Sequence, residues 1–264
     1  MASVTSRVSK IKQPKGGYIK LQDFEEIRLN KQEELNENEN IHGIIIGLAV
    51  DYLTRFLLNG DKREAFYISL MGANRAKKYI ADSEIIAKRL LKKIKDLSDD
   101  SIISACKLVS FDVWKRSLIK ALDAKRYSEI NPDMNTIENI RIMVNRSLNF
   151  FEKYGPVVKY GFTFEGEKPE YNGYTISVNT GDGDYLTKDT LWDFKVTKKK
   201  PDKNDTLQVL MYWIMGQHSK KEMFMDIKKI GIFNPRQNVI YLMSISQISN
   251  EIINIIEKDV ICYL

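Results

Sequence analysis

The feature that most constrains the fold of this chain is a change of sequence texture at Gly155-Pro156. From residue 41 to about residue 154 the sequence predicts mainly helices, separated by turn-forming residues. After Gly155-Pro156, short segments rich in Val, Ile, Thr and aromatic residues predict strands. Helices that lead into strands, a helix and two more strands indicate an α/β fold with a mixed central sheet flanked by helices.

This texture gives the expected elements and domains. We predict helices at 41–58, 65–79, 83–97, 100–124, 136–154, 205–216 and 248–258, and strands at 157–165, 174–178, 184–186, 190–197, 229–233 and 239–244. Asn172-Gly173 predicts a hairpin turn between the first two strands. The expected domains are a polar, irregular N-terminal arm at 1–40, a mainly helical region at 41–155 packed on the core, and the core itself at 156–264.

Composition narrows the class of protein. The formal net charge of +6 suits a polyanionic partner, although many basic proteins never bind nucleic acid. Cys106 and Cys262 lie far apart and form no CxxC pair, which argues against a disulfide framework, a zinc ribbon and an iron–sulfur cluster. A reducing cytoplasm fits this cysteine usage.

Several sequence signals are missing. The basic N-terminus has no apolar run behind it and predicts no signal peptide. The apolar stretch 41–58 carries Asp51 and Arg55, which a lipid-facing helix would not tolerate, so we expect no membrane span. No GxxxxGK[ST] loop is present, and we expect no ATP-driven activity.

Asp184, Asp193 and Lys195 form the group of residues that indicates chemistry. If 191–196 is a strand, Asp193 and Lys195 project from one face and Trp192 and Phe194 from the other. Asp184 begins the preceding strand and lies close by if the two strands pair as a hairpin. Two carboxylates can hold a hard divalent cation for phosphodiester hydrolysis, and an ammonium can offset charge on the phosphate. The alternative is a surface hairpin with solvated Asp and Lys side chains.

The helix expected at 205–216 is apolar nearly all round and should be buried. Its strongly polar interior residues, Gln208 and Tyr212, lie four apart and therefore on one face. A buried amide needs hydrogen-bond partners, which a polar site beside the helix would supply. Alternatively, Gln208 binds a nearby backbone carbonyl.

Three short motifs follow one another in these segments: GxxD at residues 181–184, DxK at 193–195 and QxxxY at 208–212. Together they resemble the RecB-type branch of the PD-(D/E)XK nuclease superfamily, which includes recombination and CRISPR-associated exonucleases. The resemblance covers about residues 157–245. It implies a restriction-endonuclease-like core and a metal-dependent deoxyribonuclease.

The resemblance also implies roles for single residues. Asp184 and Asp193 would bind Mg²⁺ or Mn²⁺ with the backbone carbonyl of Phe194, and Lys195 would position the attacking water. Gln208 and Tyr212 would orient the site and touch the DNA backbone. Asp182 lies on the same face as Asp184 and is a rival ligand if the strand register is shifted by two residues.

Members of this branch also carry a histidine on an N-terminal helix, in a pattern like GxxxH. Here Gly47 is followed by Asp51, so aspartate stands where histidine is expected. Asp51 is therefore a further candidate ligand, and the alternative is an i,i+4 ion pair with Arg55. We expect His42 at the start of a helix and His218 on the surface.

A basic run follows the proposed site, with Lys198, Lys199, Lys200 and Lys203 as candidate contacts to the DNA backbone. The alternative is a solvated loop. DNA is the expected substrate, and RNA stays open because phosphate contacts do not reveal the sugar. Cleavage from ends or within a strand, and an oligomeric or protein partner, stay open as well. The alternative function is a catalytically inactive nucleic-acid-binding or adaptor protein on the same fold.

Overall fold

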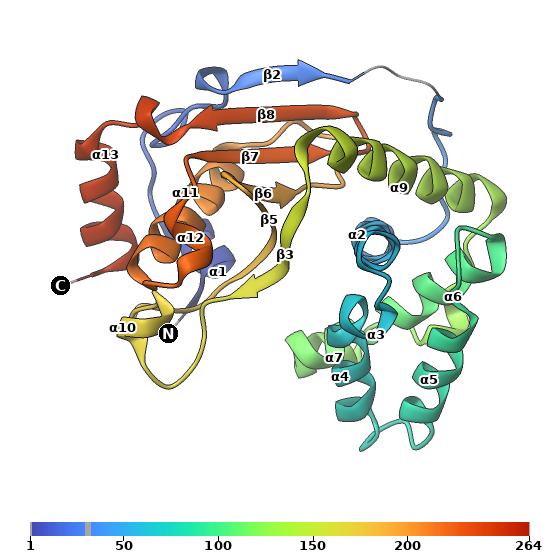
Figure 1. Cartoon of the computed structure of the whole chain (residues 1–264). Coiled ribbons are helices and arrows are strands. Elements are labelled where there is room, and N and C mark those ends of the chain that lie inside the picture. Colours follow the sequence, from blue (N-terminus) through green and yellow to red (C-terminus); the bar gives the residue numbers. More distant parts are fainter. Residues whose placement is uncertain (1, 30–32, 264) are drawn as a thin grey trace. The chain divides into compact units, whose positions relative to one another are not determined.

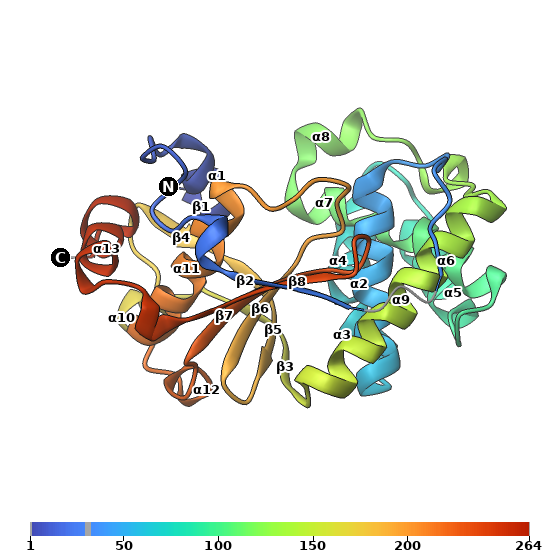
Figure 2. The same ribbon diagram turned by 90° about the horizontal axis from the view of Figure 1, so that it is seen from above.

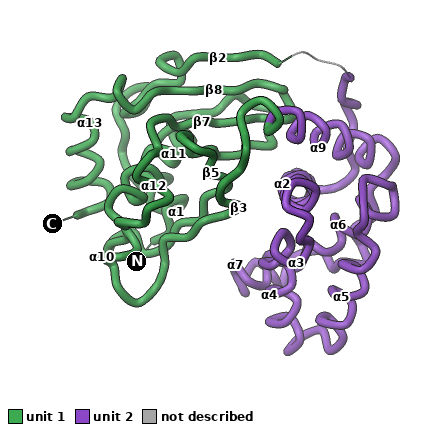
Figure 3. Tube along the Cα trace, in the orientation of Figure 1, with its two compact units in different colours: residues 1–30, 151–264 green, residues 31–150 purple. Residues whose placement is uncertain are grey.

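The chain divides into two compact units in the structure, a computed structural model that describes residues 2–29 and 33–263. Unit 1 comprises residues 1–30 and 151–264, and unit 2 comprises residues 31–150 (Figure 3). Residues 1, 30–32 and 264, which belong to the expected arm and core, lie outside the described residues. The expected irregular arm is wrong for much of 2–28, because this segment supplies a helix and strands to unit 1.

Unit 1 is built on a six-stranded sheet with the order β2-β8-β7-β6-β5-β3 (Figure 1). β6 and β7 run parallel and the other neighbours run antiparallel, so the prediction of an α/β fold with a mixed sheet is confirmed. The strands are β2 (Glu25–Arg28), β3 (Val157–Thr163), β5 (Asp182–Thr187), β6 (Thr190–Phe194), β7 (Lys229–Asn234) and β8 (Val239–Ser244). A separate parallel pair joins β1 (Ala2–Ser3) to β4 (Val178–Thr180).

The central helix of unit 1 is α11 (Lys203–His218), which packs on β6 and β7 beside α1 (Val4–Lys10) (Figure 2). Asp202 caps the N-terminus of α11, because its side chain accepts hydrogen bonds from the backbone N–H groups of Asn204 and Asp205. The helix is buried on most sides, as its apolar sequence predicts, and it forms the core of the unit with Leu186, Leu191 and Ile232. Shorter helices complete the unit: α10 (Pro169–Asn172), α12 (Glu222–Met225) and α13 (Asn250–Ile255), the last continued by a π-helical stretch (Ile256–Ile261).

Aromatic rings fill the opposite face of the sheet. Trp192 meets Tyr154 edge to face at 5.6 Å between ring centroids, and Phe194 stacks on Phe151 at 5.6 Å. Tyr185 of β5 joins the same cluster. The alternation in β6 therefore places Trp192 and Phe194 on the face opposite to Asp193, as predicted.

The segment 172–178 differs from its prediction. Pro169 starts the short helix α10, which ends at Gly173 in the left-handed conformation with φ +69°, so Asn172-Gly173 does not form a hairpin turn. The first strand, β3, pairs with β5 instead. Of the strand expected at 174–178, Val178 lies in a strand, where it pairs with Ala2. Asn172-Gly173 therefore forms the C-terminal end of a helix and not a hairpin turn.

Unit 2 consists of helices: α2 (Gly43–Asn59), α3 (Lys62–Ala65), α4 (Tyr67–Ala76), α5 (Ser83–Lys93), α6 (Asp99–Val109), α7 (Asp112–Arg116), α8 (Leu118–Leu122) and most of α9 (Met134–Tyr154). The single helix expected at 100–124 is broken into three. At the first break, a Cβ on Gly72 would lie 1.9 Å from the Phe111 carbonyl oxygen, so α4 packs directly on this turn. Buried Asp112 then accepts hydrogen bonds from Tyr52 and Ser69. In the part of the chain that the structure describes, no helix is long and apolar enough to cross a membrane.

Candidate active site

The strand register brings Asp184 and Asp193 together. Tyr185 pairs with Trp192 and Leu186 with Leu191, so the next position along the hairpin sets Asp184 across from Asp193. The backbone N–H of Phe194 donates to Asp184 Oδ2 at 2.8 Å, which fixes this carboxylate beside the end of β6. Asp193 is 2% exposed. The prediction that the two strands pair as a hairpin and bring the carboxylates together is confirmed.

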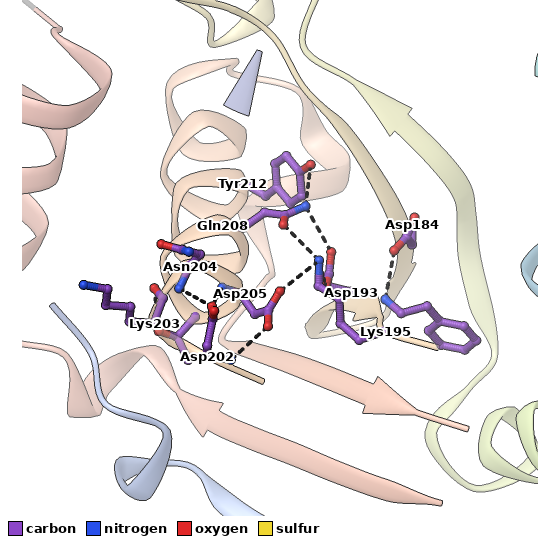
Figure 4. Close-up of polar contacts among 11 residues, drawn as sticks. Asp184, Asp193, Lys195, Asp202, Lys203, Asn204, Asp205, Gln208 and Tyr212 are labelled. Carbon is purple, nitrogen blue, oxygen red and sulfur yellow. Dashed lines mark hydrogen bonds and ion pairs between the residues drawn. The ribbon is translucent and has the colours of Figure 1, made fainter. Parts of the chain in front are cut away.

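Lys195 follows directly after β6 and returns toward the same spot (Figure 4). Its ammonium lies 3.1 Å from Asp193 Oδ2 and 3.4 Å from Asp205 Oδ1, and it donates to Gln208 Oε1 at 2.9 Å. These three oxygens match the three hydrogens of the ammonium. The Lys195 side chain is thus held by one strand and one helix at once.

The electrostatic surroundings keep Lys195 charged. Burial by itself lowers the pKa of this ammonium, but the carboxylates of Asp193, Asp205 and Asp184 raise it well above its ordinary value of 10.5. The group can therefore donate hydrogen bonds and carry positive charge, and it has no free lone pair with which to act as a base.

Gln208 links the strand residues to α11. Its Nε2 donates to Asp193 Oδ1 at 3.4 Å and to the Tyr212 hydroxyl at 3.0 Å, while its Oε1 accepts from Lys195. Both ends of the amide are engaged by the polar site. This confirms the prediction that a polar site supplies the hydrogen-bond partners of Gln208. The alternative, a bond from Gln208 to a nearby backbone carbonyl, is not what the structure shows.

Tyr212 is 2% exposed and lies behind Gln208. Its ring stacks on Phe164 and meets Phe162 edge to face. Burial, helped by the negative charge of Asp193, raises the pKa of the Tyr212 hydroxyl well above 10.0. This buried position offers little surface for the DNA contact that was expected of Tyr212, and its hydroxyl accepts a hydrogen bond from the Gln208 amide instead.

Gly181, the glycine of the GxxD motif, lies against the side chains of Val4, Phe164 and Tyr212. A Cβ at this position would lie 2.8 Å from Val4 Cγ2 and 3.2 Å from Tyr212 Cε1. A larger residue would therefore push the start of β5 away from α11. The glycine lets the strand that carries Asp184 approach the helix that carries Gln208.

Asp205 is a member of the site that the sequence motifs missed. It lies in the first turn of α11, where Oδ2 accepts the Asp202 N–H at 2.9 Å and Oδ1 faces Lys195. Its spacing of three from Gln208 and seven from Tyr212 places all three on one helix face. That spacing was the signal in the sequence that could have found it.

The basic run lies at the surface near the start of α11. Lys198, Lys199, Lys200 and Lys203 are all exposed, and Lys203 is the first residue of α11. Lys200 forms an ion pair with Glu26 of β2 at 2.9 Å. Asp182 is the exposed first residue of β5, two residues from Asp184 on the same face, and it therefore stays a rival ligand.

The remaining candidates have other partners. Asp51 belongs to unit 2 and forms the i,i+4 ion pair with Arg55 at 2.8 Å, which was its alternative interpretation. His42 caps the N-terminus of α2 by accepting from the Ile44 N–H, as expected of a helix-start residue. His218 is half-buried, 2.9 Å from Glu257 and stacked on Tyr263, and is thus less exposed than expected.

The donor set suits a hard divalent cation. Mg²⁺ binds well to one or two carboxylates and completes its shell with water, so Asp184, Asp193 and the Phe194 carbonyl are oxygen ligands of the right kind. Among residues 2–29 and 33–263, no three His, Cys, Asp or Glu side chains gather closely enough to hold a metal ion by themselves. A metal at this position would therefore depend on backbone and water oxygens as well.

Comparisons of the chain with protein-family models, with curated proteins and with solved structures gave no match. The geometry of this site and the motifs that build it are therefore the observations that bear on function.

Proposed function

We propose that this chain is a metal-dependent nuclease that hydrolyses DNA phosphodiester bonds, with a PD-(D/E)XK, restriction-endonuclease-like core in unit 1. The observation that carries the proposal is the juxtaposition of Asp184 and Asp193 across the β5–β6 hairpin, with Lys195 beside them. The network from Lys195 through Gln208 to Tyr212 supports it, because it holds the charged residues in one geometry.

Asp184, Asp193 and the Phe194 carbonyl would hold Mg²⁺ or Mn²⁺, which when bound polarises a phosphoryl oxygen and lowers the pKa of a bound water. The contribution of the protein is to fix both carboxylates on adjacent strands. The N–H of Phe194 does this for Asp184, and the amide of Gln208 does it for Asp193.

Lys195 contributes a hydrogen bond and a positive charge. Its contacts to Gln208 at 2.9 Å and Asp193 at 3.1 Å are shorter than its contact to Asp205 at 3.4 Å. The Asp205 contact is therefore the one that Lys195 exchanges most readily for a water or a phosphate oxygen. With the other two contacts kept, the ammonium stays aimed while it orients the attacking water and offsets charge on the phosphate.

The proposal is tested by incubating the full chain with linear and circular DNA, single- and double-stranded, and with RNA of matching sequence. Each substrate is tested with Mg²⁺, with Mn²⁺ and with a chelator. We expect cleavage of DNA that requires the metal and is lost in Asp193→Asn. The matched control is Asp189→Asn, because Asp189 lies at the opposite end of the same hairpin, paired with Lys229 at 3.0 Å. Absence of cleavage of every substrate, or equal cleavage by Asp193→Asn, refutes the assignment.

A second candidate function, a catalytically inactive binding or adaptor protein on the same fold, is favoured by one observation. The Lys195 ammonium already has three acceptors, as in a purely structural ion-pair network. Calorimetric titration with Mn²⁺ separates the two functions. The nuclease requires a binding isotherm that Asp184→Ala weakens, whereas the adaptor gives no binding.

A further inference from the structure

A cavity of about 250 Å³ lies in unit 2, formed by the turn that follows α4, by the turn between α6 and α7, by α7 and α8, and by the segment that leads into the 3₁₀ helix at Tyr127–Glu129. Figures 1 and 2 show α7 beside α4. Four of its lining residues are aromatic: Tyr79, Phe111, Trp114 and Tyr127. The cavity volume is smaller than that of most pockets for drug-sized ligands, about 300 to 1,000 Å³, and it suits one small flat group.

The rings are arranged in two pairs. Tyr79 and Trp114 lie 5.2 Å apart between centroids with their planes at 35°, and Phe111 stacks on Tyr127 at 5.9 Å. Phe111 is buried and forms the floor, whereas Tyr79 is 54% exposed. An exposed tyrosine ring contributes little to the packed core. The part of the ring that Trp114 does not cover is available to a planar ligand, which aromatic side chains bind by stacking.

The charge around the cavity is positive. The two segments that bring in Tyr79, Trp114 and Tyr127, residues 75–79 and 112–129, contain eight Lys or Arg residues and three acidic residues, Asp112, Asp123 and Glu129. Lys125 and Arg126 are exposed and line the cavity itself. Such an excess of positive charge selects for an anionic ligand. It disfavours a second copy of this chain, whose net charge is +6.

We propose that this cavity binds one base of a single-stranded nucleic acid, stacked on Tyr79 and Trp114, with the neighbouring phosphates on Lys125 and Arg126. Stacking faces beside cations are the features by which proteins hold single strands. A base in a duplex is stacked and paired and cannot present its faces to these rings without leaving the helix. The proposal uses residues of unit 2 alone and does not depend on the nuclease proposed for unit 1.

The experiment measures binding of the full chain to a fluorescently labelled oligonucleotide by anisotropy, in a chelator so that no metal-dependent cleavage occurs. Replacing Tyr79→Leu removes the stacking face but keeps an apolar side chain, and Tyr79→Phe keeps the ring. We expect Tyr79→Leu to weaken binding about 5-fold to 100-fold, the range for loss of one base–aromatic stack, and Tyr79→Phe to bind like the native chain. Thermal melting verifies that both variants are folded.

Charge is tested with matched double variants. Lys125→Ala with Arg126→Ala removes two cations at the cavity, and Lys92→Ala with Lys93→Ala removes two exposed cations from α5. The first pair should weaken binding more and flatten the dependence on salt more than the second. On the native chain, an oligonucleotide with abasic sites at every position should bind about 5-fold or more weakly than its base-containing counterpart.

Several results overturn the proposal. Equal affinity of Tyr79→Leu and the native chain, or of abasic and normal strands, shows that no base is stacked. Equal losses in the two double variants show that only net charge matters. Tighter binding of duplex than of single strand, or binding of a mononucleotide as tight as that of the strand, also contradicts it. Binding is measured here in chelator and cleavage is measured separately with metal, so failure of the nuclease proposal and failure of this one give different results.

Discussion

Replacing Lys195 with methionine isolates the electrostatic work of the proposed site. Methionine keeps an unbranched stem of similar reach and removes the charge, the hydrogen bond to Gln208 and the ion pairs with Asp193 and Asp205. The native ammonium lies 3.1 Å from Asp193 and 3.4 Å from Asp205, and Asp184 adds to the same negative field. In Lys195→Met these carboxylates face one another without their cation.

The expected loss of unfolding free energy depends on which member of the Lys195–Asp193 ion pair is buried. Removing one member of a buried ion pair typically costs about 3 to 5 kcal/mol. Here the Lys195 side chain is 21% exposed and the Asp193 side chain 3%, so the charge left behind is the buried one. Because the Lys195 side chain is partly exposed, the expected loss of unfolding free energy lies at the lower end of this range, about 3 kcal/mol.

A divalent cation should reverse this loss if the carboxylates bind one. A ligand that binds the folded chain adds about 2.7 kcal/mol of stability at 100 times its Kd. The assay is urea denaturation of the native chain and of Lys195→Met, each in chelator and in Mn²⁺. The control is Lys229→Met, which removes an exposed partner of Asp189 and should cost less than about 1 kcal/mol and gain nothing extra from Mn²⁺.

Two results would refute this reasoning. If Lys195→Met is as stable as the native chain in chelator, Asp193 does not carry a buried charge that needs Lys195. If Mn²⁺ stabilises Lys195→Met no more than Lys229→Met, the carboxylates are not a cation site. The first result contradicts the electrostatic account and the second contradicts the metal.

Three further predictions concern other residues. Asp184→Ala should weaken Mn²⁺ binding by more than about tenfold and Asp182→Ala by less, as measured by calorimetry, because Asp184 is fixed by the Phe194 N–H and Asp182 is exposed at the strand start. Equal losses would mean that the two carboxylates share the role. Lys199→Ala should flatten the slope of log affinity for DNA against log salt by about 0.7 to 0.9. Lys200→Ala should flatten it by less, because Lys200 already pairs with Glu26. Equal slopes of the two variants in an anisotropy series would contradict this prediction. Burial raises the pKa of Asp112 above its ordinary value of 3.8. The stability that its protonated form contributes is therefore present below pH 3.8 and is lost as the pH rises through the raised pKa. Asp112→Asn should flatten this pH dependence in urea denaturation at a series of pH values, and an unchanged profile would contradict the assignment.

Much of unit 1 could be predicted from the sequence because its strands and its main helix carry local signals. The alternation of Trp192, Asp193, Phe194 and Lys195 assigns faces without any tertiary information, and the structure agrees. The boundaries of β7 and β8 fall within one residue of those expected, since both strands are dense in β-branched and apolar residues.

Elements whose partners are distant in sequence were not predictable in this way. β2 lies at the edge of the sheet and is mostly exposed, so it lacks an alternating apolar pattern, and its pairing with β8 joins residues more than 200 positions apart. The breaks around α7 depend on Phe111 packing against Gly72, which no local pattern encodes. Propensity described these segments as coil and as one long helix, and tertiary contacts decided otherwise.

The candidate site contains both residues that a local sequence signal reveals and a residue whose role depends on tertiary contacts. Asp184, Asp193, Lys195 and Gln208 were found because each belongs to a short motif, but the motif gives no reason for Asp205. Asp205 has a local explanation as a helix-capping residue, since its carboxylate accepts the Asp202 N–H. Only the approach of β6 to α11 gives its second oxygen a partner in Lys195. One carboxylate thus fixes both the start of the helix and the position of the ammonium. Asp205→Asn separates the two roles, because it keeps the capping acceptor and removes the charge. We expect this variant to have a stability within about 1 kcal/mol of the native chain and a changed rate of cleavage.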